Sequence, residues 1–72
     1  MGKKVKPQIP HIDEYDVEEV IKCKDRYQAY LYIKHGLSPY DVFVSGEDMI
    51  FIFPKNELCK KLYAQWRSFN LK

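Results

Sequence analysis

The chain has 72 residues, of which 46% are hydrophobic, 15% aromatic and 31% charged. This length allows one domain with a small core, and the composition excludes a disordered chain. The net charge of +2 is too small to indicate a nucleic-acid partner by itself, and two cysteines are too few for a disulfide framework. No apolar run is long enough to cross a bilayer. We therefore expect a cytoplasmic protein with reduced thiols and no membrane association.

The N-terminal segment contains Pro7, Pro10 and several lysines, and it has neither helical nor strand periodicity. This pattern is typical of an extended chain. We assign residues 1–16 to a flexible N-terminal arm and residues 17–72 to a single α+β domain.

Three strands are predicted. Residues 17–23 form a short, moderately polar strand that suits a sheet edge. Residues 40–53 form a β-hairpin, because two apolar runs flank a turn in which Gly46 can adopt a positive φ. The second run, residues 49–53, is apolar at every position, which indicates a central strand covered on both faces.

A first helix is expected over residues 26–35. Asp25 and Gln28 fit a capping box at its start, and Gly36 can end it in the left-handed conformation. We expect Gln28 and Tyr32 to point away from the core. The predicted buried stripe comprises Tyr27, Tyr30, Leu31 and Ile33.

A second helix is expected to begin near Asn56, which can cap it after Pro54 ends the last strand. Its opposite face carries Lys60, Ala64 and Arg67. The apolar stripe that should pack on the sheet comprises Leu58, Leu62, Trp66 and Phe69.

The element order is therefore β-α-β-β-α. Placing the most apolar strand in the middle gives an antiparallel sheet of order 1-3-2 with both helices on one face. The other face would then be open, and such patches usually mark interfaces. Three alternatives could cover this open face: the arm through Ile9, Ile12 and Tyr15, a second copy of the chain, or a foreign partner.

The run Lys-Asp-Arg-Tyr-Gln-Ala-Tyr-Leu-Tyr-Ile-Lys-His-Gly at residues 24–36 is followed by Ile-Phe-Ile-Phe at residues 50–53 and Asn-Glu-Leu at residues 56–58. Together they resemble a family of short domains of phages and Gram-positive bacteria with no assigned chemistry. That family shares an Ala-aromatic-Leu helix closed by Lys-x-Gly, a Phe-x-Phe strand and a Glu-Leu-rich final helix. The chain departs from it in the arm, at Pro54 and Lys55, and in a more basic last helix. The resemblance implies the same fold and a phage or mobile-element setting.

No catalytic, metal or cofactor site is expected. His11, His35, Cys23 and Cys59 lack the spacing of metal ligands. Cys59 with His35 lacks the signature of an activated nucleophile, and the acidic run in residues 13–19 is typical of a solvated, edge-protecting segment. There is no glycine-rich phosphate loop, so we expect neither an enzyme nor a small-molecule substrate.

Two binding functions remain. The first is a non-catalytic protein-binding module that modulates or inhibits a host or phage protein complex by occupying a surface, with a homodimer as a further alternative. Its predicted contact residues are Met49, Phe51, Phe53, Tyr32 and Tyr63. The second function is nucleic-acid binding through basic residues and stacking aromatics. The basic residues in question are Lys3, Lys4, Lys6, Lys60 and Arg67.

Overall fold

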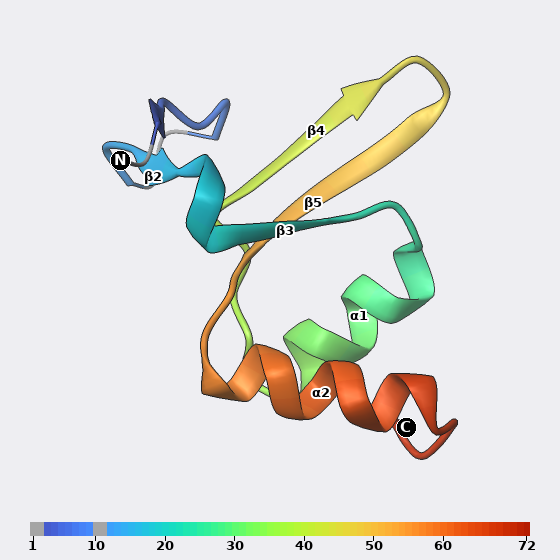
Figure 1. The fold of residues 1–72 in the computed structure, drawn as a ribbon. Helices are drawn as coiled ribbons and strands as arrows, with labels where there is room; N and C mark the ends of the chain where they lie inside the picture. The colour runs from blue at the N-terminus through green and yellow to red at the C-terminus, as the bar shows by residue number, and fades with distance from the viewer. Residues whose placement is uncertain (1–2, 10–11) are drawn as a thin grey trace.

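The computed structural model describes residues 3–9 and 12–72. Its elements, in chain order, are β1 (Lys4–Val5), β2 (Tyr15–Asp16), the 3-10 helix η1 (Val17–Glu19), β3 (Val20–Cys23), α1 (Arg26–Lys34), β4 (Asp41–Ser45), β5 (Asp48–Pro54) and α2 (Glu57–Arg67). Strands β3, β5 and β4 form an antiparallel sheet in that spatial order. The two helices lie on one side of it (Figure 1). The predicted α+β class and the 1-3-2 order of this sheet are confirmed, and a hairpin of β1 and β2 is added to them.

The turn between β4 and β5 is the one that the sequence predicts. Ser45 pairs with Asp48, which leaves Gly46 and Glu47 as the two turn residues. Gly46 has φ of 64°. A type II′ turn needs a positive φ only at the first of its two central residues, which is the position of Gly46. Turns of this type match the twist of the flanking strands.

Helix α1 begins and ends as predicted. The carboxylate of Asp25 accepts hydrogen bonds from the amides of Tyr27 and Gln28 at 2.9 and 3.1 Å. The Gln28 side chain does not complete a capping box, since its amide donates to the Tyr32 hydroxyl at 2.8 Å. At the other end Gly36 has φ of 100°, and its amide donates to Ile33, the first of two bonds that close a Schellman motif.

Of the predicted buried stripe of α1, only Leu31 is buried, whereas Tyr27, Tyr30 and Ile33 are exposed. Tyr32, which was predicted to point away from the core, is fully buried. Apolar side chains occur all round this short helix, so their period does not select one face. Ala29 is also fully buried, and its small side chain allows a close approach to the sheet. Tyr32, one turn further on, consequently packs edge-on against Phe53, with ring centroids 5.3 Å apart.

The helix side of the sheet holds the larger core. Its buried members are Cys23, Ala29, Leu31, Tyr32, Leu37, Phe53, Cys59, Leu62 and Leu71, with Ile21, Phe51, Leu58 and Trp66 packed against them. Helix α2 is capped by Asn56, whose side chain accepts from the amide of Cys59 at 2.9 Å, as predicted. Most of the predicted stripe of α2 meets this core. Phe69 does not, because it is 91% exposed.

The chain turns back sharply after α2. Phe69 has φ of 61°, and its amide donates to Trp66 while that of Asn70 donates to Gln65, which is again a Schellman motif. This turn directs Phe69 outward and returns Leu71 to the core. Leu71, two residues after Phe69, therefore takes the place predicted for Phe69 in the apolar stripe.

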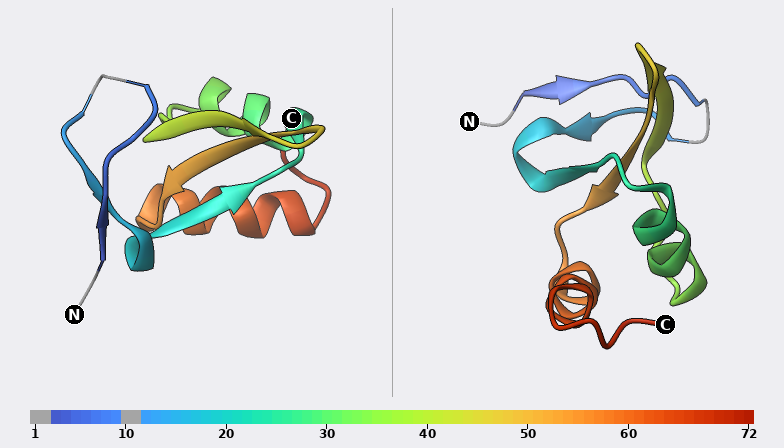
Figure 2. Two further views of the ribbon diagram at one scale, coloured as in Figure 1. Left: turned by 90° about the horizontal axis from the view of Figure 1, so that it is seen from above. Right: turned by 90° about the vertical axis from the view of Figure 1, so that its right-hand side faces the viewer.

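The far side of the sheet is covered by the N-terminal segment. Tyr15, Ile50 and Ile52 are buried together there, with Val5 and Ile12 among the half-buried residues around them. Figure 2 shows this segment on the side of the sheet opposite the helices. Of the three predicted covers, the chain's own N-terminal segment is the one that the structure contains.

A buried carboxylate fixes this segment. Asp41 is 1% exposed and accepts hydrogen bonds from the backbone amides of Gln8, Ile9 and Val42 at 2.9 to 3.1 Å. Three backbone N–H groups therefore stabilise this carboxylate without a basic side chain, and that of Gln8 is shared between its two oxygens.

Candidate binding groove

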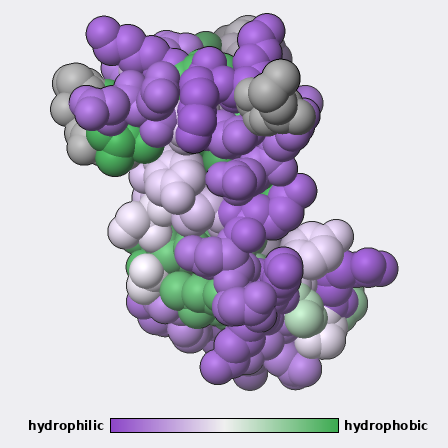
Figure 3. All heavy atoms as spheres, turned by 60° about the vertical axis from the view of Figure 1, so that its left-hand side comes forward, coloured by the Kyte–Doolittle hydropathy of each residue, from purple (hydrophilic) through white to green (hydrophobic). Residues whose placement is uncertain are grey.

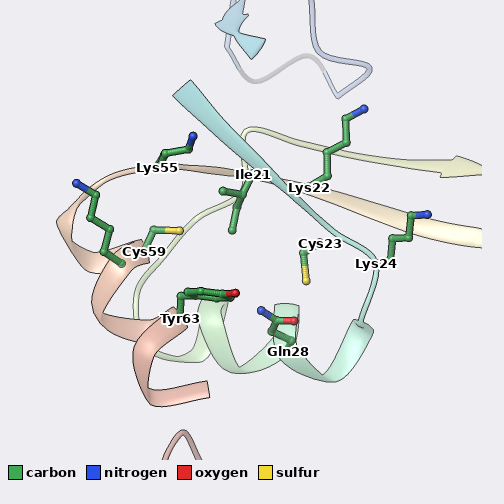
Figure 4. Close-up of a pocket in the computed structure, with 9 residues that line it drawn as sticks. Ile21, Lys22, Cys23, Lys24, Gln28, Lys55, Cys59 and Tyr63 are labelled. Atoms are coloured by element: carbon green, nitrogen blue, oxygen red, sulfur yellow. The ribbon is translucent and has the colours of Figure 1, made fainter. Parts of the chain in front are cut away.

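A groove runs between the outer edge of β3, the start of α2 and helix α1 (Figure 4). It has a volume of about 490 Å³. Its lining residues are Ile21, Lys22, Cys23, Lys24, Gln28, Lys55, Cys59, Lys60 and Tyr63. Most of the face of the molecule drawn in Figure 3 is hydrophilic, with hydrophobic surface confined to patches between the polar side chains.

Four lysines from three parts of the chain line this groove. Lys22 belongs to β3, Lys24 follows it, Lys55 precedes α2 and Lys60 lies in the first turns of α2. In Figure 4, Lys55 lies at one end and Lys24 at the other. None of the described lining residues is acidic. The groove therefore concentrates positive charge on a molecule whose net charge is only +2.

Tertiary structure places the lysines around one groove. The amide of Lys55 donates to the carbonyl oxygen of Glu19 at 2.9 Å, which holds the segment before α2 beside the start of β3. Lys60 Nζ lies 3.7 Å from a carboxylate oxygen of Glu57, and both side chains are mostly exposed. Such an exposed pair contributes little, so the charge of Lys60 stays available to a ligand.

The floor of the groove is less polar and holds both cysteines. Burial raises the pKa of the Cys23 thiol, which donates a hydrogen bond to the carbonyl oxygen of Asp25 at 3.3 Å. Burial also raises the pKa of the Cys59 thiol, and the nearby charge of Lys55 offsets this in part. Both thiols are therefore protonated at neutral pH, which makes them poor nucleophiles.

The other residues weighed for chemistry lie elsewhere. His35 follows the last turn of α1, where Nε2 is 2.8 Å from the carbonyl oxygen of Lys72, and it does not line the groove. Within residues 3–9 and 12–72, no three His, Cys, Asp or Glu side chains are grouped to hold a metal ion, and His11 falls outside these ranges. No described helix is long and apolar enough to span a membrane.

The predicted protein-contact residues separate into two groups. Phe53 is fully buried and Phe51 packs against the helix-side core, so the prediction of an open sheet face bearing them is wrong. Tyr32, predicted on the surface, is also fully buried. The physical reason is that the odd-numbered aromatics of β5 face the helices. Met49 and Tyr63 are exposed, and Tyr63 lines the groove.

The predicted nucleic-acid residues also separate. Lys3 and Lys4 belong to the N-terminal segment, whereas Lys60 and Arg67 lie on α2, across the sheet from it. Lys6 is exposed within the N-terminal segment. On α2 the guanidinium of Arg67 lies 5.9 Å from the ring centroid of Tyr63, which continues the basic surface along the helix. The two basic regions therefore do not form one continuous surface.

A second hollow lies near the end of α2. Its volume is about 360 Å³, and it is lined by Tyr27, Trp66, Arg67, Phe69 and Leu71. The rings of Tyr27 and Trp66 are 6.1 Å apart, and Tyr27 also stacks on Tyr30. This aromatic surface is apolar and contains Phe69, whose backbone adopts the left-handed conformation.

Three groove lysines were missed in the sequence: Lys22, Lys24 and Lys55. Alternating lysines at the end of an edge strand have an ordinary explanation in edge protection. The available signal was the topology, since an antiparallel first strand beside residues 49–53 places Lys55 next to its beginning. No family model, curated protein or solved structure matches this chain.

Proposed function

We propose that this protein is a small non-catalytic binding module whose groove holds an acidic segment of a partner protein. By occupying that segment it would modulate or inhibit a host or phage protein complex in the cytoplasm. The observation that carries the proposal is that four lysines surround one groove, with no acidic residue among its described lining. Like charges gathered in this way repel one another, and a bound anionic segment removes the repulsion.

The character of the floor favours a peptide over a lone anion. Ile21 and the ring of Tyr63 offer apolar contact, and Gln28 offers a polar amide. A site with apolar area at its centre and charges at its rim has the composition of a protein interface. The protonated thiols of Cys23 and Cys59 offer no nucleophile, which supports binding over catalysis.

A phage or mobile-element origin is the second part of this proposal. The resemblance to phage and Gram-positive domains carries the expectation of a mobile-element protein acting on a host or phage target. Nucleic acid is the second candidate, because the same lysines, together with Arg67 and Tyr63, can also meet phosphates and stack on bases.

The test measures anisotropy of a fluorescein-labelled peptide of alternating Glu and Val, with a Lys and Val peptide and labelled single-stranded DNA for comparison. One variant replaces the four groove lysines, Lys22, Lys24, Lys55 and Lys60, by Gln. A charge-matched control replaces four exposed lysines elsewhere, Lys3, Lys4, Lys34 and Lys61, by Gln.

We expect the Glu peptide to bind the native protein, with affinity falling about tenfold or more in the groove variant and about twofold or less in the control. Equal losses in both variants would mean that net charge alone attracts the peptide. Tighter binding of DNA than of the Glu peptide at physiological salt, lost in the groove variant, would replace the proposal by the nucleic-acid function.

A further inference from the structure

The groove follows the backbone edge of β3. Four consecutive residues, from Ile21 to Lys24, line it. Side chains of a strand point alternately to opposite faces, so a cavity lying on one face would contact only every second residue. Lys22 also lines the hollow on the opposite side of the sheet. Contact with successive residues therefore places the groove at the edge of the sheet.

The register shows which backbone groups of β3 point outward. The amide of Lys55 donates to Glu19, which continues the register in which Ile21 pairs with Phe53 and Cys23 with Phe51. In an antiparallel ladder, pairs that exchange hydrogen bonds alternate with pairs that do not. The amides and carbonyls of Ile21 and Cys23 are therefore directed to β5.

Consequently, the amide and carbonyl of Lys22 and the carbonyl of Val20 are directed to the outer edge, while the Val20 amide closes the last turn of η1. Within the described residues, β3 has a strand neighbour on one side only, since the sheet order is β3-β5-β4. An edge of this kind accepts an additional strand through main-chain hydrogen bonds.

We infer that the acidic partner segment binds in an extended conformation and pairs with β3 as a fourth strand of the sheet. This inference rests on the proposed function. Side chains of the added strand would alternate between the groove, where they meet Lys55 and Lys60, and the opposite side of β3, where they meet Lys22. Main-chain bonds supply affinity and the lysines select acidic side chains.

A second copy of this chain fits the edge less well than an acidic segment. Pairing of two β3 edges would bring two sets of groove lysines together, and their like charges repel. Charge complementarity therefore favours a segment rich in Asp or Glu.

The experiment records amide hydrogen exchange of the full chain by NMR, with and without saturating Glu and Val peptide. Strand addition predicts that the amide of Lys22 exchanges at least about tenfold more slowly in the complex, while those of Ile21 and Cys23 are already slow in the free protein. An unchanged exchange rate of the Lys22 amide between the free and the peptide-bound protein would overturn the inference.

A pair of variants gives a second readout. Lys22→Pro removes both the charge and the outward N–H, whereas Lys22→Ala removes the charge alone; proline is tolerated on an edge strand where its N–H would face outward. We expect Lys22→Pro to bind the peptide about tenfold more weakly than Lys22→Ala, with equal unfolding midpoints. Equal affinity of the two variants overturns strand addition and leaves the proposed function standing, while absence of any peptide binding overturns both. A concentration-dependent dimer that loses its association in Lys22→Pro would instead assign the edge to a second copy.

Discussion

The carboxylate of Asp41 accepts the backbone amide of Gln8 at 3.0 Å to each of its oxygens, across 33 residues of sequence. Together with its bonds from Ile9 and Val42, this carboxylate joins the N-terminal segment to the start of β4. The segment is thereby held over Ile50 and Ile52, so the far side of the sheet is part of the core.

Replacing Asp41 by Asn should lower the free energy of unfolding by about 2 kcal/mol, because an amide offers one acceptor oxygen and places its own N–H groups among donors. Urea unfolding measures the loss. Asp48→Asn, at an exposed position of the same hairpin, is the matched control and should change stability little. Equal effects of the two substitutions would show that the buried carboxylate does not hold the segment.

Two substitutions on one side of β5 distinguish core from surface. Phe51→Lys should destabilise the protein by about 3 kcal/mol or more, since it puts a charge against the helix-side core. Met49→Lys should cost about 0.5 kcal/mol or less, because Met49 is 39% exposed near the hairpin turn. Thermal unfolding followed by circular dichroism compares them, and a stable Phe51→Lys protein would contradict the packing described here.

The backbone conformation of Phe69, just after α2, is predicted to lower the stability of the protein. Phe69 adopts φ of 61°, a conformation that favours glycine, whereas the equivalent residue after α1 is Gly36. Phe69→Gly should therefore raise the free energy of unfolding by about 1 kcal/mol. Phe69→Ala keeps the backbone strain and should be neutral, because the ring is 91% exposed. If both variants are destabilised equally, the ring contributes to the fold.

Stability should fall in alkaline solution. Burial raises the pKa of Cys23, Cys59, Tyr15 and Tyr32 in the folded protein, so the unfolded chain loses these protons at lower pH. Their contribution is fully present below the ordinary cysteine pKa of about 8.5 and is lost as the pH rises through the folded values.

Urea unfolding between pH 6 and 11 measures this dependence. A variant with Cys23→Ala and Cys59→Ala should start from lower stability and delay the alkaline loss until the tyrosines titrate, above about pH 10. A stability that stays constant to pH 11 in the native protein would contradict the burial of these four groups.

The parts of the fold that follow local rules were predictable. Gly46 in the turn, Asp25 and Asn56 at the helix starts and Gly36 at a helix end each act within a few residues of chain. The strand order was predictable because one run is apolar at every position and needs cover on both faces.

The parts that depend on packing were not predictable from the pattern. Apolar residues surround α1, so the fit of Ala29 against the sheet selects the buried face. Asp41 gives no sequence signal, because its partners are backbone amides far away in the chain. The groove was missed for the same reason, since Lys22 and Lys55 line one groove only once β3 pairs with β5.

The connectivity of the sheet has a consequence for the order of assembly. Strands β4 and β5 meet through the short turn at Gly46, whereas β3 reaches β5 only after α1 and the hairpin have been traversed. Contacts between residues that are distant along the chain close longer loops and form late during folding. The hairpin is therefore the expected nucleus, and the lysine groove forms only later, when β3 pairs with β5.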